Sequence, residues 1–209
     1  MNDDNLHLLW FTYCMVTVYI DGKDLAAWIG PEYQSATLRL LVLGESRYDE
    51  EFTDREIIEW RIAGKLPSLQ RRTFVNFERS VLDGEHSEVD MKSFWNKTIF
   101  YNYIRNFFPG GPRVSPSYRM RVDPQNVETL RTVLHELKPT HAIVWGFANW
   151  DEIDAGSPWT PDGRIVGTEQ PFCSTTIDGN RILFTRVSHP SAGFSSRFWA
   201  PVISSFLSM

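Results

Sequence analysis

The chain has 209 residues, of which 42% are hydrophobic and 14% are aromatic, and its net charge is −5. This composition excludes a disordered protein, and the length suits one α/β domain with a hydrophobic core, so we expect residues 1–209 to form one domain. The only cysteines, Cys14 and Cys173, are too few for a disulfide scaffold or an all-cysteine metal or iron–sulfur site.

Two further observations concern location. The start Met-Asn-Asp-Asp lacks the positive charge of a secretory signal, and the apolar segment Leu8–Ile20 is too short to span a bilayer. We therefore expect a cytoplasmic protein, with Leu8–Ile20 as a core element and no membrane partner.

The first half of the chain predicts one strand and one helix. Leu38–Leu43 is fully apolar, as is typical of a strand buried on both faces. Thr53 or Asp54 can cap a helix that runs to about Ala63. The segment Arg71–Val81 is ambiguous between helix and strand.

The second half alternates between the two periodicities. Residues 90–107 carry apolar side chains that could share a helical face, although the later part is rich in strand-forming residues. Residues 123–137 predict a helix with Asp-Pro at its start, and 195–207 predict another. Residues 141–146 and 181–190 predict strands. This alternation predicts a three-layer α/β/α sandwich with a mostly parallel central sheet.

Three predicted strands end in polar or glycine-containing tips. These tips are Gly44-Glu45-Ser46, Gly146-Phe147 and His189-Pro190-Ser191. In parallel sheets ligands bind at the carboxyl ends of the strands, so we expect the three tips to converge on one site.

Basic residues are concentrated in two segments that contain no acid, although the whole chain is acidic. Such segregation can create a local positive field that holds a nucleic-acid backbone, and we expect the two segments to share one face. The residues are Lys92, Lys97, Arg105, Arg113, Arg119 and Arg121 in the first segment, and Arg181, Arg186 and Arg197 in the second.

One chemistry that fits the tips is a serine esterase. Ser46 would be the nucleophile and His189 its base, as in esterases that carry Gly-Asp-Ser after a first strand. Arg186 stands where that class places an Asp to orient the His, and the chain has no GxSxG motif. The esterase is therefore the weaker alternative.

A second chemistry follows from four short motifs that occur in order at predicted strand ends. They are GESRY (44–48), IFYNY (99–103), AIVWG (142–146) and HPSAGFS (189–195). With these motifs the sequence resembles the uracil-DNA glycosylase superfamily over about Leu38–Leu207. The resemblance implies a fold of that type and hydrolysis of an N-glycosidic bond in DNA. The iron–sulfur branch of the superfamily needs four cysteines and is excluded.

The resemblance implies roles for the residues of these motifs. His189 would donate a hydrogen bond to the leaving base, and Asn102 would recognise the base edge. The best-known branch prepares the attacking water with an Asp at the position of Ser46, so we expect Glu45 or Asp49 to serve instead. The base pocket would be formed by Gly44, Ser46, Tyr48 and Asn102.

The late motif also implies contacts with DNA. Base flipping leaves a hole in the stack, and Phe194 is the nearest candidate for the wedge that fills it, with Ala192 as the alternative. Further DNA contacts are expected from Ser191, Gly193, Arg119, Arg121 and Arg197.

The sequence therefore predicts a monomeric DNA glycosylase that needs no metal and no organic cofactor. Its target would be a non-standard base, either uracil or a modified pyrimidine such as a modified cytosine, which in phage DNA would make the protein antiviral. A non-catalytic nucleic-acid-binding member of the same fold is the alternative, because Ser46 replaces the usual Asp. Preference for single- or double-stranded DNA stays open.

Overall fold

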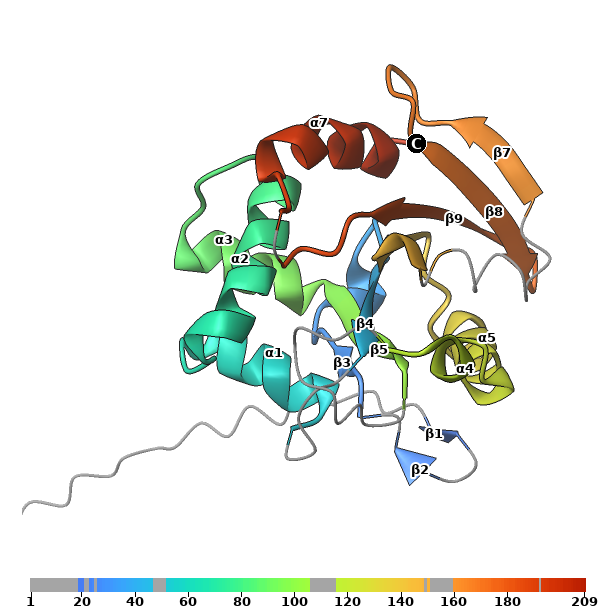
Figure 1. Cartoon of the computed structure of the whole chain (residues 1–209), viewed down its shortest axis with the longest axis horizontal. Coiled ribbons are helices and arrows are strands. Elements are labelled where there is room, and N and C mark those ends of the chain that lie inside the picture. The colour runs from blue at the N-terminus through green and yellow to red at the C-terminus, as the bar shows by residue number, and fades with distance from the viewer. Residues whose placement is uncertain are drawn as a thin grey trace, which may run out of the picture.

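The computed structural model describes residues 19–20, 23–24, 26–46, 52–105, 116–148, 150, 160–191 and 193–209. Its centre is a seven-stranded sheet with the order β3-β5-β4-β6-β9-β8-β7 (Figure 1). The strands are β3 (Trp28–Ile29), β4 (Leu40–Ser46), β5 (Thr98–Ile104), β6 (His141–Trp145), β7 (Thr160–Arg164), β8 (Pro171–Ile177) and β9 (Asn180–Val187). A separate two-stranded sheet pairs β1 (Tyr19–Ile20) with β2 (Lys23–Asp24).

The sheet is mixed. Its central strands β5, β4, β6 and β9 are parallel, whereas β3, β8 and β7 pair antiparallel at the two edges. The expectation of a mostly parallel sheet is therefore correct only for the centre. Asp178 and Gly179 both have positive φ, 50° and 76°, which is the backbone of a tight hairpin turn, and this turn makes β8 and β9 antiparallel.

The predicted helices at 53–63, 123–137 and 195–207 are confirmed, and the ambiguous segment 71–81 is helical. Thr53 caps α1 in a reciprocal capping box with Glu56, and Asp123 caps α5 ahead of Pro124. The helices are α1 (Asp54–Ile62), α2 (Ser68–Val81), α3 (Glu88–Asn96), α4 (Tyr118–Arg121), α5 (Pro124–Leu137) and α7 (Ser196–Leu207), with a short 3-10 helix, η1 (Tyr33–Ser35).

The periodic segment 90–107 contains two elements. Helix α3 ends at Asn96, and β5 begins at Thr98 after Lys97 as the cap. All seven residues of β5 are buried, because the strand lies between β3 and β4 inside the sheet. Aromatic and β-branched residues suit such a strand, so the later part of the segment, which the sequence left open, is a strand.

Helices cover both faces of the sheet. One face packs against α1, α2, α3 and α7, and the opposite face packs mainly against α5 (Figure 1). The mixed α/β class is thereby established, with a hydrophobic core on each side of the sheet. No helix in the described ranges is long and apolar enough to cross a membrane.

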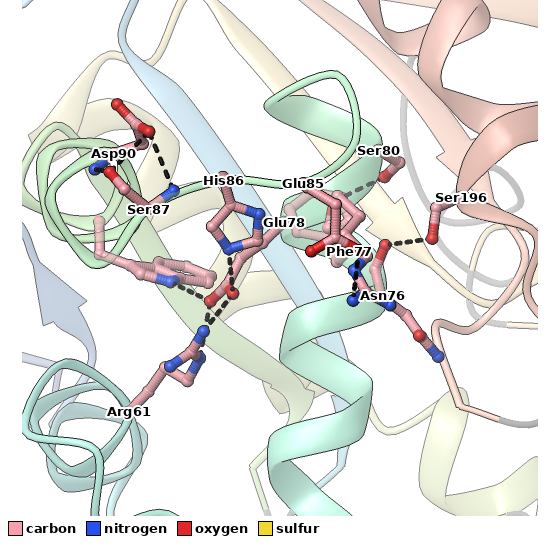
Figure 2. A network of polar contacts seen from close by, with 12 residues as sticks. Arg61, Asn76, Phe77, Glu78, Ser80, Glu85, His86, Ser87, Asp90 and Ser196 are labelled. Atoms are coloured by element: carbon pink, nitrogen blue, oxygen red, sulfur yellow. Dashed lines mark hydrogen bonds and ion pairs between the residues drawn. The ribbon is translucent and has the colours of Figure 1, made fainter.

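A buried carboxylate links α1, α2 and α3. Glu78, which is fully buried, accepts hydrogen bonds from Arg61 Nε at 2.9 Å and from Trp95 Nε1 at 2.8 Å, and His86 Nε2 lies 3.2 Å from it (Figure 2). Arg61 Nη2 also contacts the second oxygen, at 2.5 Å. A buried charge with this many partners fixes the relative positions of the three helices.

Candidate functional site

The order of the parallel strands reverses between β5 and β6, and the position outside the carboxyl ends of β4 and β6 is here called the crevice. From β4 the chain continues to β5 on one side, and it then crosses to β6 on the other side of β4. Ligands bind at such reversals, outside the carboxyl ends of the strands. Gly44–Ser46 ends β4, and Gly146 follows β6. His189 Cβ lies 4.0 Å from the position that a Cβ on Gly146 would occupy. The three predicted tips therefore meet at this crevice.

Asn102 lies in β5 directly opposite Gly44 and is 7% exposed. Its backbone N–H donates to Asp54 Oδ2 at 2.8 Å, and its Nδ2 donates to Asp54 Oδ1 at 2.6 Å. Its other amide atom, Oδ1, is only 2.3 Å from where a Cβ on Gly44 would be. Gly44 thus provides the space for this side chain, and the role of Asn102 in recognising a base stays a prediction.

Asp54 is a site residue that the sequence analysis missed. It is the first residue of α1 and is 1% exposed, and its Oδ2 also lies 3.6 Å from Arg105 Nη1. In the sequence Asp54 follows the helix cap Thr53, so an acidic residue in the first turn of a helix needed no further explanation. Only the packing of α1 against β5 shows that Asp54 faces Asn102.

Glu45 projects from β4 to the opposite face of the sheet from Gly44 and Ser46. Arg121 Nη2, at the end of α4, lies 3.3 Å from Glu45 Oε1, and the two side chains are 13% and 12% exposed. The expected phosphate contact of Arg121 is therefore replaced by an ion pair, because its guanidinium is turned inward to Glu45. Such a pair fixes the position of the carboxylate beside the crevice.

His189 is half-buried at the end of the segment that follows β9. Its Nδ1 lies 3.0 Å from Ser191 Oγ, and its ring lies edge-on to Trp145, with the ring centroids 6.0 Å apart. Burial lowers the pKa of His189 below its ordinary value of 6.5, while the negative charge of Glu45 acts in the opposite direction. The imidazole is therefore neutral at pH 7 and lies within the field of Glu45.

Helix α2 holds the loop that carries His189. Asn76 Nδ2 donates to the carbonyl of Pro190 at 2.9 Å. Ser196 Oγ donates to the carbonyl of Asn76 at 3.0 Å (Figure 2). Gly193, with φ of +78°, turns the chain between these two anchors. The loop is therefore attached to the scaffold on both sides of the turn.

Aromatic side chains surround Trp199 next to this loop. Phe194, the expected wedge, is half-buried and stacks on Trp199 with centroids 6.3 Å apart and an interplanar angle of 17°. Phe198 is 63% exposed and Phe147 is 46% exposed, and both also contact Trp199. The guanidinium of Arg186 lies 4.8 Å from the centre of the Phe147 ring. Phe147 was named only as part of the strand tip Gly146-Phe147, and Phe198 was not named as a candidate for contact with DNA.

Tyr48, Asp49, Ala192 and Arg113 lie outside the described residues. Ser46 is a described residue, and its Oγ is buried without a hydrogen-bond partner among the described residues. Nδ1 of His189 faces Ser191 instead of Ser46. No hydrogen bond in the described part of the chain joins Ser46 to His189, which is unfavourable to the esterase alternative.

The described residues of the two basic segments are spread between the two ends of the sheet rather than gathered at one end. Lys97 precedes β5 and Arg105 follows it, so a strand of seven residues, about 20 Å long, separates them. Arg181, at the beginning of β9, is also distant from the crevice and pairs with Asp162. Arg119 and Arg197 are exposed. The charge segregation in the sequence arose from chain segments that run from one end of the sheet to the other.

Comparison with known proteins finds no family model that matches the chain and no curated protein with significant sequence similarity. In the described ranges, no group of three or more His, Cys, Asp or Glu side chains is arranged to hold a metal ion. The function must therefore be argued from the crevice itself.

Proposed function

We propose that the protein is a DNA glycosylase of the uracil-DNA glycosylase type, which hydrolyses the bond between a non-standard pyrimidine and deoxyribose. The observation that carries the proposal is a set of polar side chains near the carboxyl ends of the parallel strands: Asn102 lies beside Gly44, His189 lies beside Gly146, and the charge of Glu45 acts on His189. These residues come from β4, β5 and the segment after β9, and they supply a carboxylate, an amide and a neutral imidazole. These are the groups that activate water, recognise a base edge and stabilise a leaving base.

The reaction requires two opposite charges to be stabilised. As the C1′–N bond breaks, its electron pair moves to the base and positive charge develops on the sugar. Water then bonds to C1′ and loses a proton, and the base gains one, so an abasic site and a free base result. Glu45 accepts the proton of the water, and its contact with Arg121 keeps the carboxylate in place. Asp49 is the second candidate for this task.

His189 stabilises the leaving base as a neutral donor. The Ser191 hydroxyl lies 3.0 Å from Nδ1, and in the tautomer in which it donates to Nδ1 the ring hydrogen is on Nε2, where it is available to a base oxygen. Burial disfavours the imidazolium, as described above, so the hydrogen bond strengthens only as negative charge develops on that oxygen. A group of this kind lowers the barrier more than it strengthens substrate binding.

Two alternatives make different predictions. A binding-only protein with the same pocket would retain modified DNA without releasing a base. A serine esterase would need Ser46, whose Oγ has no described partner, and would be indifferent to DNA.

The test is single-turnover base release from single- and double-stranded oligonucleotides that carry uracil or a modified pyrimidine, followed by alkaline cleavage at abasic sites. We expect His189→Ala to bind the substrate normally but to release base at least about 100-fold more slowly. His135→Ala is the matched control, because His135 is exposed at the end of α5. Absence of base release by the parent protein, or full activity in His189→Ala, would overturn the proposal.

A further inference from the structure

We infer that Asn76 on α2 and Trp199 on α7 are positioning residues, which hold the backbone on the two sides of His189 and thereby fix where its imidazole can act. This inference rests on the proposed function, because it assigns the support of the group that would stabilise the leaving base. Both residues would act through His189 and not on the substrate.

The segment after His189 is held by Asn76. Asn76 Nδ2 donates to the carbonyl of Pro190 at 2.9 Å and lies 3.4 Å from the carbonyl of Ser191. The hydroxyl of Ser191 in turn lies 3.0 Å from Nδ1 of His189. Pro190 has a fixed φ, and it makes a helical backbone unfavourable for the residue before it, which is His189. The Asn76 amide therefore holds the backbone that carries the hydroxyl partner of the imidazole.

The segment before His189 is held by Trp199. The indole Nε1 of Trp199 donates to Ser188 Oγ at 2.9 Å, and Trp199 is buried. An indole N–H only donates, so a buried indole needs an acceptor, and Ser188 supplies it. The residue that precedes His189 is thus attached to α7, whereas the two residues that follow it are attached to α2.

The two helices are joined to each other at the same place. Ser196 Oγ, on the first residue of α7, donates to the backbone carbonyl of Asn76 at 3.0 Å (Figure 2). Asparagine is a poorer helix former than alanine, and the bonds of the Asn76 side chain to the loop offset that cost inside α2. The segment 188–191 and the two helices therefore form one hydrogen-bonded unit around His189.

The position of the imidazole matters for both its reach and its pKa. A displacement of about 1 Å can cost about 100-fold in rate when a group must meet a developing charge. Burial is the larger influence on the pKa of His189 and lowers it, while the charge of Glu45 raises it. A loosened segment would expose the ring and let its pKa rise toward 6.5. Rate and pKa should therefore change together when either support is removed.

The first test follows the ring itself and needs no substrate. Asn76→Leu and Trp199→Phe each remove one N–H donor while a side chain of similar shape remains. We expect the titration midpoint of His189, measured by NMR on the folded protein, to rise toward 6.5 in both variants. A merely structural role would lower the free energy of unfolding and leave this midpoint unchanged. Parent-like midpoints in both folded variants would overturn the inference.

Two matched controls lose comparable hydrogen bonds elsewhere. Asn96→Ala removes the contact of Asn96 Nδ2 with Glu32, and Trp28→Phe removes the bond from the Trp28 indole to the carbonyl of Trp95 at 2.8 Å. Both contacts lie just before the start of β5, at the end of the strand opposite the crevice. We expect both controls to keep the midpoint of His189 at its parent value. A shift as large as in the test variants would overturn the inference, because any loss of stability would then move the ring.

The second test measures the consequence for chemistry by single-turnover base release. We expect Asn76→Leu and Trp199→Phe each to slow release at least about tenfold without weakening binding of the oligonucleotide, because His189 acts in the transition state. Since both residues act through one ring, the double variant should lose less than the product of the two single losses. Losses that multiply would overturn the inference. If the parent protein releases no base, the proposed function fails, whereas the NMR titration still decides whether the two residues position His189.

A measurement on the parent protein covers the case in which a variant does not fold. We expect the indole N–H of Trp199 and the side-chain amide of Asn76 to exchange slowly with solvent, because both donate to partners within the fold. Rapid exchange of both groups would overturn the inference, whatever base the protein releases.

Discussion

The Asn102 side chain occupies the space beside Gly44, and an ideal Cβ on Gly44 would lie 2.3 Å from Asn102 Oδ1. No real Cβ tolerates such a distance. Gly44 lies within β4 and is needed for close approach rather than for an unusual backbone conformation. A contact between two paired residues of β4 and β5 therefore decides whether the amide can enter the crevice.

Gly44→Ala should displace the Asn102 amide and weaken its bond to Asp54. We expect base release to fall at least about 100-fold, with a loss of about 1–3 kcal/mol in the free energy of unfolding. Gly64→Ala is the control, because Gly64 has a positive φ and open space around it, so it should lose stability without losing activity. Equal activity of Gly44→Ala and the parent protein would show that Asn102 does not contact the base.

The water-activating carboxylate can be identified by substitution. Glu45→Gln and Asp49→Asn each remove one candidate base, and we expect at least one of them to slow base release about 100-fold or more. Glu59→Gln, an exposed change on α1, is the control. Parent-like release in both variants, with normal folding, would mean that another group handles the water.

The titration of His189 provides a test that needs no substrate. Because burial lowers its pKa, the folded protein keeps His189 neutral as the pH falls below 6.5, whereas the unfolded chain takes up the proton first. The contribution of the neutral His189 ring to the free energy of unfolding is therefore fully present above pH 6.5. It is lost as the pH falls through the pKa that His189 has in the folded protein.

Glu45 raises the pKa of His189, so Glu45→Gln should move the midpoint to lower pH still. The measurement is an NMR titration of the His189 ring in both proteins. An unchanged midpoint, or one above 6.5, would contradict the electrostatic coupling of the two residues.

The buried network of Glu78 should matter for stability and not for chemistry. Glu78→Gln leaves Arg61 without its countercharge in a buried position, and we expect a loss of about 3–5 kcal/mol in the free energy of unfolding, measured with urea. Glu85→Gln removes an exposed ion pair with Arg79 and should change stability by less than about 1 kcal/mol. Similar losses in the two variants would contradict the central role of Glu78.

The sequence predicted the elements whose signals are local. The apolar run of β4 and the capping residues of α1 and α5 each determine their own segment, and all three predictions are confirmed. The antiparallel pair β8–β9 was missed, although Asp178-Gly179 is a typical hairpin turn. Residues 90–107 carry both helix and strand patterns. Residues 98–104 form a strand because β5 lies inside the sheet, between β3 and β4.

Site residues were predictable where a strand tip marked them and unpredictable where a partner defined them. His189 and Glu45 belong to strand tips and were named. Asp54 acquires its role from Asn102, and Arg121 acquires its role from Glu45, across elements that only the folded chain brings together. Likewise, the position of each basic residue at one or the other end of a strand could not be predicted from the run of basic residues in the sequence.

The final prediction concerns the residue that fills the duplex after a base is flipped out. Phe194 follows from the late sequence motif, but it stacks on Trp199 and is half-buried, whereas the neighbouring Phe198 is 63% exposed. A wedge must leave its own surroundings to enter DNA, and an exposed ring does so at lower cost than a packed one. We therefore expect Phe194→Ala and Phe198→Ala to slow base release from duplex DNA to different extents.

If Phe194 is the wedge, Phe194→Ala should slow base release from duplex DNA much more than from single-stranded DNA, where no stack has to be refilled. If Phe198 is the wedge, Phe198→Ala should show that difference, and Phe194→Ala should mainly reduce stability through lost packing on Trp199. Phe147→Ala is the control for an exposed ring in the same cluster. The assay is single-turnover base release on matched single- and double-stranded oligonucleotides. Because a packing defect slows both substrates alike, equal losses on the two for both variants would exclude either ring as the wedge.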